Sequence, residues 1–376
     1  MTVSKNPFVF GKIVDEDHFC NRVQEMHDLQ QNVHNGYSTW LFAPRRYGKS
    51  SLIKQVFKRT SDVKTIYFDL YNIETIDDFA RKYSNVLSKE LFNWKDDIKS
   101  LTSSIKSYFE NLSPQISFDE NALPTLSLQK QQLNKQSDLE TILSIPEKIA
   151  QQKNISICIA FDEFQEISRV NSFIIHWMRS KFQNQQRVSY IFLGSKQSLM
   201  EDIFTNINSP FYEYALKMNI KPIAREELFK YIRNKFEENT ILIEDDLIDT
   251  IIDKSGGHPH YTQYFASVIF DMLKAEPNIK KEELIEKWIN KIIDSQSVIF
   301  QNIYDDLSNN QRKVLWAIAM QPEELFSTTT RNALKLPPAS SITSSISTLL
   351  KKDLIEKVEK SYKVSSPVFK EWLIRL

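Results

Sequence analysis

The most constraining feature of the chain is a phosphate-loop pattern between a predicted strand and a predicted helix. Residues Ala43 to Ser50 read Ala-Pro-Arg-Arg-Tyr-Gly-Lys-Ser and match GxxxxGK[ST] at every fixed position except the first, where Ala43 replaces glycine. The aromatic and β-branched run 37–42 is typical of a buried strand, and residues 51–57 have apolar side chains at helical spacing. Strand, loop and helix in this order predict a phosphate-binding turn in an α/β fold.

A loop of this kind binds phosphates through its backbone and a few side chains. Consecutive N–H groups and the helix N-terminus surround the phosphates. Lys49 would bond the β and γ oxygens, with a catalytic role as well, and Ser50 would bind magnesium. The alternative is a basic surface turn that contains Gly-Lys-Ser by chance. The residues predicted to bind ATP here are Pro44, Arg45, Arg46, Tyr47, Gly48, Lys49, Ser50 and Ser51.

A second motif consists of an apolar run, 155–161, that ends in two acids. Asp162 would hold magnesium, directly or through water, and Glu163 would orient and deprotonate the attacking water. The alternative is a solvated strand end with ordinary surface acids. Together with the phosphate loop, the pair predicts Ser50 and Asp162 as metal ligands, Glu163 as a catalytic residue, and ATP and Mg²⁺ as cofactors.

A third segment places a hydroxyl at the end of another predicted strand. The run 188–193 is followed by Gly-Ser-Lys, and parallel strand ends would bring Ser195 to the edge that holds Asp162. Ser195 either contacts the γ-phosphate or the attacking water as a catalytic residue, or caps the helix predicted over 197–204.

A turn at 253–261 contains the last candidate side chain, His258. It either reaches a nucleotide or packs within the turn and the core. A zinc site there lacks further ligands.

Strands and helices alternate as far as residue 223, which predicts a P-loop NTPase fold with a parallel sheet flanked by helices. Residues 95–138 are rich in Ser, Lys, Gln and Asn, lack a clear period and are interpreted as an insertion. Helices then follow one another as a lid, and three short helices before a hairpin at 354–358 and 361–364 resemble a winged helix. The predicted domains are an ATPase core at 1–223, a helical lid at 224–300 and a winged-helix domain at 301–376. The predicted strands are 37–42, 65–70, 155–161, 188–193 and 216–220.

Charge and composition exclude several classes of protein. Lys plus Arg and Asp plus Glu are each 48, so the net charge is zero and argues against nucleic-acid binding mainly by bulk electrostatics. Two cysteines exclude a disulfide framework or a four-cysteine zinc site. The N-terminus has no targeting pattern and no apolar run is long enough to span a membrane, so we expect a cytoplasmic protein without a membrane partner.

The motifs together resemble the predominantly archaeal and bacterial ATPases of the AAA+/STAND superfamily, relatives of origin-recognition ATPases with a C-terminal winged helix. The resemblance implies an N-terminal segment near the adenine, so Phe10 and Gly11 join His258 as nucleotide-binding residues. It also implies magnesium-dependent ATP binding and a nucleotide-driven switch. Asn21 stands where the family usually has glycine before its arginine. The segments that carry the resemblance are 6–12, 19–25, 44–53, 161–166, 194–196 and 256–259.

These observations predict an ATP-binding, ATP-hydrolysing switch protein that couples nucleotide state to a partner or an assembly. One alternative is an ATP-regulated DNA-binding protein that uses residues 338–352 as a recognition helix, whose outward residues are Ser and Thr followed by Lys351 and Lys352. Another is a nucleotide-bound scaffold without turnover. The candidate partners are ATP or ADP, an unidentified protein, duplex DNA and further copies of the chain.

Overall fold

The described residues of the chain form two compact units. Those within 15–221 make the first, called the core unit, and those within 1–14 and 222–376 make the second, called the C-terminal unit. The computed structural model describes residues 5–14, 17–92, 107–109, 112, 114–118, 124–128, 136–171, 173–320, 325–358 and 361–376.

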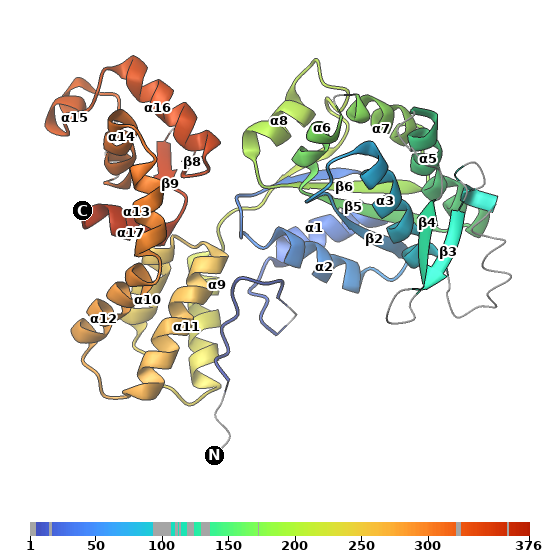
Figure 1. Ribbon diagram of the computed structural model, residues 1–376. Coiled ribbons are helices and arrows are strands. Elements are labelled where there is room, and N and C mark those ends of the chain that lie inside the picture. The colour runs from blue at the N-terminus through green and yellow to red at the C-terminus, as the bar shows by residue number, and fades with distance from the viewer. Residues whose placement is uncertain are drawn as a thin grey trace. The chain divides into compact units, whose positions relative to one another are not determined.

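A five-stranded sheet forms the centre of the core unit, with strand order β2-β5-β6-β1-β7 and every pairing parallel (Figure 1). The predicted α/β fold class is therefore confirmed, and each predicted strand end lies within about two residues of the observed one. The strands are β1 (Thr39–Phe42), β2 (Val63–Asp69), β5 (Ser156–Asp162), β6 (Val188–Gly194) and β7 (Leu216–Asn219).

Side chains that alternate along the strands build two apolar layers, one on each face of the sheet. In β5, Ile157, Ile159 and Phe161 enter one layer, while Cys158 and Ala160 enter the other. Both faces are buried, which is why the central strands appear in the sequence as continuous apolar runs. The first layer is covered by α3 (Ile76–Leu91), α5 (Gln136–Lys153), α7 (Ile174–Phe182) and α8 (Gln197–Thr205), and the second by α1 (Val23–His34) and α2 (Lys49–Arg59) (Figure 1).

The segment interpreted as an insertion, 95–138, contains regular structure in its described part. β3 (Pro114–Phe118) and β4 (Pro124–Leu128) form an antiparallel hairpin, and Leu126 and Leu128 are buried in the core layer of α3. Each strand has a proline as its first residue, a position where the missing N–H is tolerated. Residues 115–118 and 125–128 each alternate polar and apolar side chains, a strand pattern that the interpretation of this polar segment as an insertion missed. Residues 107–109, 112 and 136–138 of the segment are also described, and its other residues lie outside the described ones.

The C-terminal unit is mainly helical and contains one two-stranded hairpin among its described residues, followed by a final helix. The winged helix consists of the hairpin and the helices α14, α16 and α17. Helix α13 packs on it through Phe300, and the ring centroid of Phe300 lies 4.9 Å from that of Phe369. Sequence patterns predicted neither α13 nor α17. The elements are α9 (Arg225–Glu237), α10 (Asp245–Ser255), α11 (Pro259–Ala275), α12 (Lys281–Asp294), α13 (Ser297–Asp305), α14 (Asn309–Ala319), α15 (Thr328–Ala333), α16 (Ala339–Lys351), β8 (Ile355–Val358), β9 (Ser361–Val364) and α17 (Pro367–Ile374).

The N-terminal segment packs on the helices of the C-terminal unit, although sequence analysis places it in the core domain. The Phe8 ring centroid lies 5.4 Å from that of Phe236 and 6.0 Å from that of Phe270. Asn6 Nδ2 donates to the carbonyl oxygen of Ser267 at 2.9 Å. The unit division between residues 221 and 222 lies beside the predicted boundary near residue 224. In the described part of the chain, no helix combines the length and the apolar composition that crossing a membrane requires.

Candidate active site at the carboxyl edge of the sheet

The phosphate loop joins the end of β1 to the start of α2 and takes its shape from two left-handed residues. Gly48 has φ +84° and is the N-cap of α2, and Arg46 has φ +64°. Glycine suits position 48 for its conformation rather than for space, because a Cβ there would meet nothing within 4 Å in the described structure. Tyr47 is buried while Arg45 and Arg46 are exposed, so the tyrosine anchors the loop and the arginines face outward.

Lys49 lies inside the loop that precedes it. Its Nζ donates to the carbonyl oxygens of Ala43 at 2.7 Å and Pro44 at 3.1 Å, and the residue is 6% exposed. Burial lowers the pKa of Lys49 to about 8, although the charges of Glu163 and Asp162 act to raise it. A lysine in this position carries a desolvated charge that an anion would stabilise.

Asp162 is the centre of the acidic motif and accepts hydrogen bonds from three elements. Ser50 Oγ, from α2, donates to its Oδ2 at 2.7 Å, and the hydroxyl of Tyr67, from β2, donates to the same oxygen. The backbone N–H of Glu163 donates to Oδ1 at 2.9 Å. Burial and, next, the charge of Asp162 raise the pKa of Tyr67 above its ordinary value, so the phenol stays a proton donor. A serine hydroxyl beside a carboxylate is a hard oxygen donor set that fits Mg²⁺.

A third acid, Asp69, lies at the same edge. In the parallel pairing of β2 and β5, Asp69 is opposite Asp162. Partial desolvation is the largest effect on Asp69 and raises its pKa. The hydrogen bond from the N–H of Tyr71 lowers this pKa, and the charges of Asp162 and Glu163 raise it. The edge therefore concentrates negative charge where a divalent cation would be bound.

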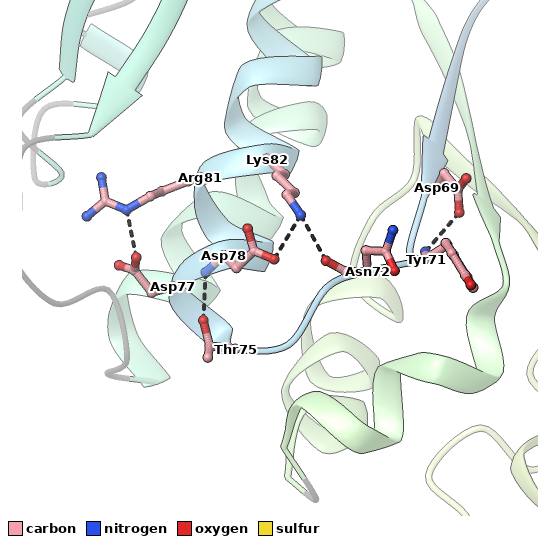
Figure 2. Close-up of polar contacts among 8 residues, drawn as sticks. All are labelled: Asp69, Tyr71, Asn72, Thr75, Asp77, Asp78, Arg81 and Lys82. Carbon is pink, nitrogen blue, oxygen red and sulfur yellow. Dashed lines mark hydrogen bonds and ion pairs between the residues drawn. The ribbon is translucent and has the colours of Figure 1, made fainter.

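Polar contacts hold the loop that follows Asp69 onto α3 (Figure 2). Asp69 Oδ1 accepts the N–H of Tyr71 at 2.8 Å. Lys82 Nζ donates to the carbonyl oxygen of Asn72 at 2.9 Å and to Asp78 at 2.9 Å. Thr75 caps the helix by accepting the N–H of Asp78 at 3.1 Å. These bonds fix the end of β2 and with it the position of Asp69.

Glu163 follows Asp162 in a left-handed conformation, φ +52°, which side chains larger than glycine adopt at an energetic cost. Its Oε2 accepts a hydrogen bond from Ser195 Oγ at 2.7 Å and another from Gln165 Nε2. Ser195 does not cap α8, since the N-cap is Lys196 and has no side-chain cap bond. The structure thus brings Ser195 to Glu163, at the edge where the parallel sheet was expected to place it.

A buried arginine links the phosphate loop to the last residue of the core unit. Arg22 donates to the carbonyl oxygens of Tyr47 at 3.2 Å and Lys221 at 3.0 Å, and to Glu25 at 2.9 Å. Burial lowers its pKa despite the pairing with Glu25. Asn21 has φ +52°, a left-handed conformation in which asparagine is the best substitute for glycine.

Three residues predicted to bind nucleotide, Phe10, Gly11 and His258, belong to the C-terminal unit. The Phe10 ring centroid lies 4.9 Å from that of Tyr264, and that of His258, which is buried, lies 4.7 Å from that of Tyr261. Gly11 has φ +74°. Their contact with a nucleotide stays a prediction.

Sequence analysis assigned no site role to four residues near this edge, namely Arg22, Tyr67, Asp69 and Gln165. Arg22 and Gln165 lie in segments that carry the family resemblance, 19–25 and 161–166. A signal existed for Asp69, because a predicted strand over 65–70 contains one acid near its end. The pairing of β2 with β5 was needed to place it, and strand order is a long-range property that motif spacing does not give.

Among curated proteins, no sequence similar to the chain was found. Solved structures are similar in fold over nearly the whole length. A Walker-type ATPase of Pyrococcus abyssi is 17% identical with a TM-score of 0.63, covering 96% of this chain and 97% of that one. The ORC2 protein of Aeropyrum pernix in ADPNP-ADP complexes is 14% identical with a TM-score of 0.57, covering 98% and 96%.

Two family models also match the chain. Residues 298–375 match a probable winged helix domain. Residues 19–265, which include every edge residue described above, match an ATPase domain found predominantly in Archaea. The chain therefore belongs to this family of predominantly archaeal ATPase domains, with a winged helix domain at its C-terminal end.

Proposed function

We propose that the chain binds ATP with Mg²⁺ at the carboxyl edge of the core sheet and hydrolyses it. The observation that carries the proposal is the convergence of a buried lysine, a serine–aspartate pair and a glutamate from two separate motifs, Lys49, Ser50, Asp162 and Glu163. The charge of each acid acts on Lys49. Phosphoryl transfer depends mainly on this kind of positioning and charge stabilisation.

Each side chain has a separate role in this proposal. Lys49 exchanges its bonds to the loop carbonyls for bonds to the β and γ phosphate oxygens, which relieves its desolvation. Ser50 and Asp162 hold Mg²⁺, which neutralises phosphate charge when bound. Glu163 orients the attacking water and accepts its proton. Ser195 holds the carboxylate of Glu163 toward that water.

We also propose that hydrolysis serves as a switch on a partner or an assembly. Arg22 supports this, because it bonds both to Tyr47 in the phosphate loop and to Lys221, the last residue of the core unit. A change in the loop on nucleotide binding would act directly on the chain that joins the units. The partner is an unidentified protein or further copies of the chain.

Calorimetric titration with ATP and ADP, with and without Mg²⁺, tests the binding step. We expect Lys49→Ala to abolish binding, and Ser50→Ala to remove the dependence of affinity on Mg²⁺. Lys58→Ala, on the exposed side of the same helix, is the matched control and should bind as the wild type does. Equal affinity in Lys49→Ala and wild type would contradict the assignment of the loop. Binding without turnover would favour the nucleotide-bound scaffold instead.

A second candidate function is ATP-regulated binding of duplex DNA by the winged helix. It is favoured by the exposed Lys351 and Lys352 at the end of α16. Against it, Thr343 and Thr348 donate to the carbonyl oxygens of Ala339 and Ser344 in their own helix. Binding measured at low salt should weaken as salt rises and fall further in the Lys351→Ala, Lys352→Ala double variant; no binding at low salt would exclude this function.

A further inference from the structure

The side chain of Gln165 lies between Glu163 of the acidic motif and Ser195, which follows β6. Its Nε2 donates to Oε2 of Glu163 and lies 3.5 Å from the hydroxyl oxygen of Ser195. Ser195 Oγ in turn donates to the same Oε2 at 2.7 Å. The three polar groups form a closed triangle around one carboxylate oxygen, so the orientation of Glu163 depends on residues that follow β5 and on a residue that follows β6.

The position of Gln165 is costly for the fold. The residue is 2% exposed, and its carbonyl oxygen Oε1 has no hydrogen-bond donor in the described part of the chain. A buried, unpaired carbonyl oxygen is destabilising, and a leucine of similar size would avoid the penalty. Gly194 leaves room for the amide, because a Cβ at position 194 would lie 2.7 Å from that Oε1. A buried group that costs stability is expected where it serves a site.

We propose that Gln165 is the positioning residue for Glu163. It does not touch the reacting atoms; it holds Oε2 of Glu163 against Ser195, so that the carboxylate stays aimed at the edge where the water attacks. The inference rests on the proposed function, since it requires Glu163 to activate water. The amide of Gln165 therefore supports catalysis through the orientation of Glu163, and it does not stabilise the fold.

The test compares steady-state ATP hydrolysis and thermal unfolding of the full chain for wild type, Gln165→Leu and Gln55→Leu. Gln55 is the matched control because it is also buried in the core unit, on α2, and its Oε1 likewise lacks a donor among the described residues. We expect Gln165→Leu to lower kcat by at least about tenfold, the scale of a misplaced catalytic group, without changing KM. Its unfolding midpoint should equal or exceed that of wild type. The unfolding midpoint of Gln55→Leu should also equal or exceed that of wild type, and its kcat should be unchanged.

A double variant, Glu163→Gln with Gln165→Leu, shows whether Gln165 acts through Glu163. Its kcat should equal that of Glu163→Gln alone, because a residue that only positions another has no effect once the other is disabled. An unchanged kcat in Gln165→Leu, or a further fall in the double variant, would overturn the inference while leaving the proposed function intact. Wild-type protein that binds ATP but never hydrolyses it would overturn the proposed hydrolysis and this inference together.

Discussion

The sheet edge of the core unit and the winged helix treat polar side chains in opposite ways. Five polar side chains near the edge are buried: Arg22, Lys49, Asp162, Gln165 and Ser195. Hydrogen bonds there join segments far apart in the chain, as from Ser50 to Asp162 and from Ser195 to Glu163. Between residues 298 and 375, the one buried polar residue among those described is Ser345. Buried polar groups that are held by several segments can stabilise a bound ligand with little rearrangement. Exposed polar groups on one helix are solvated and lack this preorganisation. This difference favours ATP binding and hydrolysis at the sheet edge over a ligand-binding role for the winged helix.

Among the stability changes that test this contrast, we expect the largest when Arg22 is replaced. Removing it in Arg22→Ala leaves Glu25 and the carbonyl oxygens of Tyr47 and Lys221 without their donor, so the free energy of unfolding should fall by about 3 kcal/mol. Denaturant titration measures the change. Lys64→Ala, which breaks an exposed ion pair with Glu90, is the control and should cost less than about 1 kcal/mol. Equal losses in both variants would remove the distinction between buried and solvated charges.

A somewhat smaller loss is expected when the space beside Gln165 is filled. In Gly194→Ala the new Cβ would clash with Met200 Cγ and lie 2.7 Å from Gln165 Oε1. Overpacking should cost about 2 kcal/mol of unfolding free energy, and displacement of Gln165 should also lower kcat.

The control for this variant is Gly36→Ala in the same unit. Gly36 has φ +72° with nothing within 4 Å of the added Cβ among the described residues, so we expect strain of about 1 kcal/mol and unchanged kcat. A kcat in Gly194→Ala equal to that of Gly36→Ala would show that the crowding is absorbed by Met200 alone.

The desolvated Lys49 predicts a dependence of nucleotide affinity on pH. The pKa of Lys49 is lowered to about 8, so the ammonium is present below that pH and lost above it. From about pH 7 to pH 8 the affinity for ATP should be constant, and above pH 8 it should fall by up to about tenfold for each pH unit. Lys49→Arg keeps its charge, and its affinity should not change over the same range. A wild-type affinity that is flat up to pH 10 would contradict the buried position of the ammonium.

The smallest effect is expected on the winged helix. Thr343 is exposed on α16 and bonds only within its own helix among the contacts described, to the carbonyl oxygen of Ala339 at 3.1 Å. Thr343→Ala should change the unfolding free energy by less than about 0.5 kcal/mol and leave ATP affinity as it is. A loss above about 1 kcal/mol would break the comparison, since it would mean that this face of α16 is engaged by another part of the chain.

Local sequence patterns predicted the phosphate loop and the strand that ends at Asp162. The contacts between separate segments depend on strand pairing, which these patterns do not give. The phosphate loop and the apolar strand before Asp162 are each encoded within a short segment, so their position and type could be found in the sequence. The hairpin at Pro114 and Pro124 was missed although each strand alternates polar and apolar side chains, because each alternation spans only five residues in a polar segment and begins with a proline.

The sequence left the role of Ser195 open between a cap of the following helix and a site residue at the edge that holds Asp162. A serine before a helix is a good N-cap in isolation, yet here it donates to Glu163, a residue 32 positions away. Only the parallel pairing of β5 with β6 brings the two together. Gln165 lies in the segment 161–166, which carries the family resemblance, but no role was assigned to it, and its approach to Ser195 depends on the same pairing.

The central claim is that the carboxyl edge hydrolyses ATP through Glu163, and single-turnover hydrolysis with Mg²⁺ tests it most directly. We predict that Glu163→Gln binds ATP as tightly as wild type but releases phosphate at least about 100-fold more slowly, the usual contribution of a general base. Phosphate release at the wild-type rate in Glu163→Gln would contradict the claim.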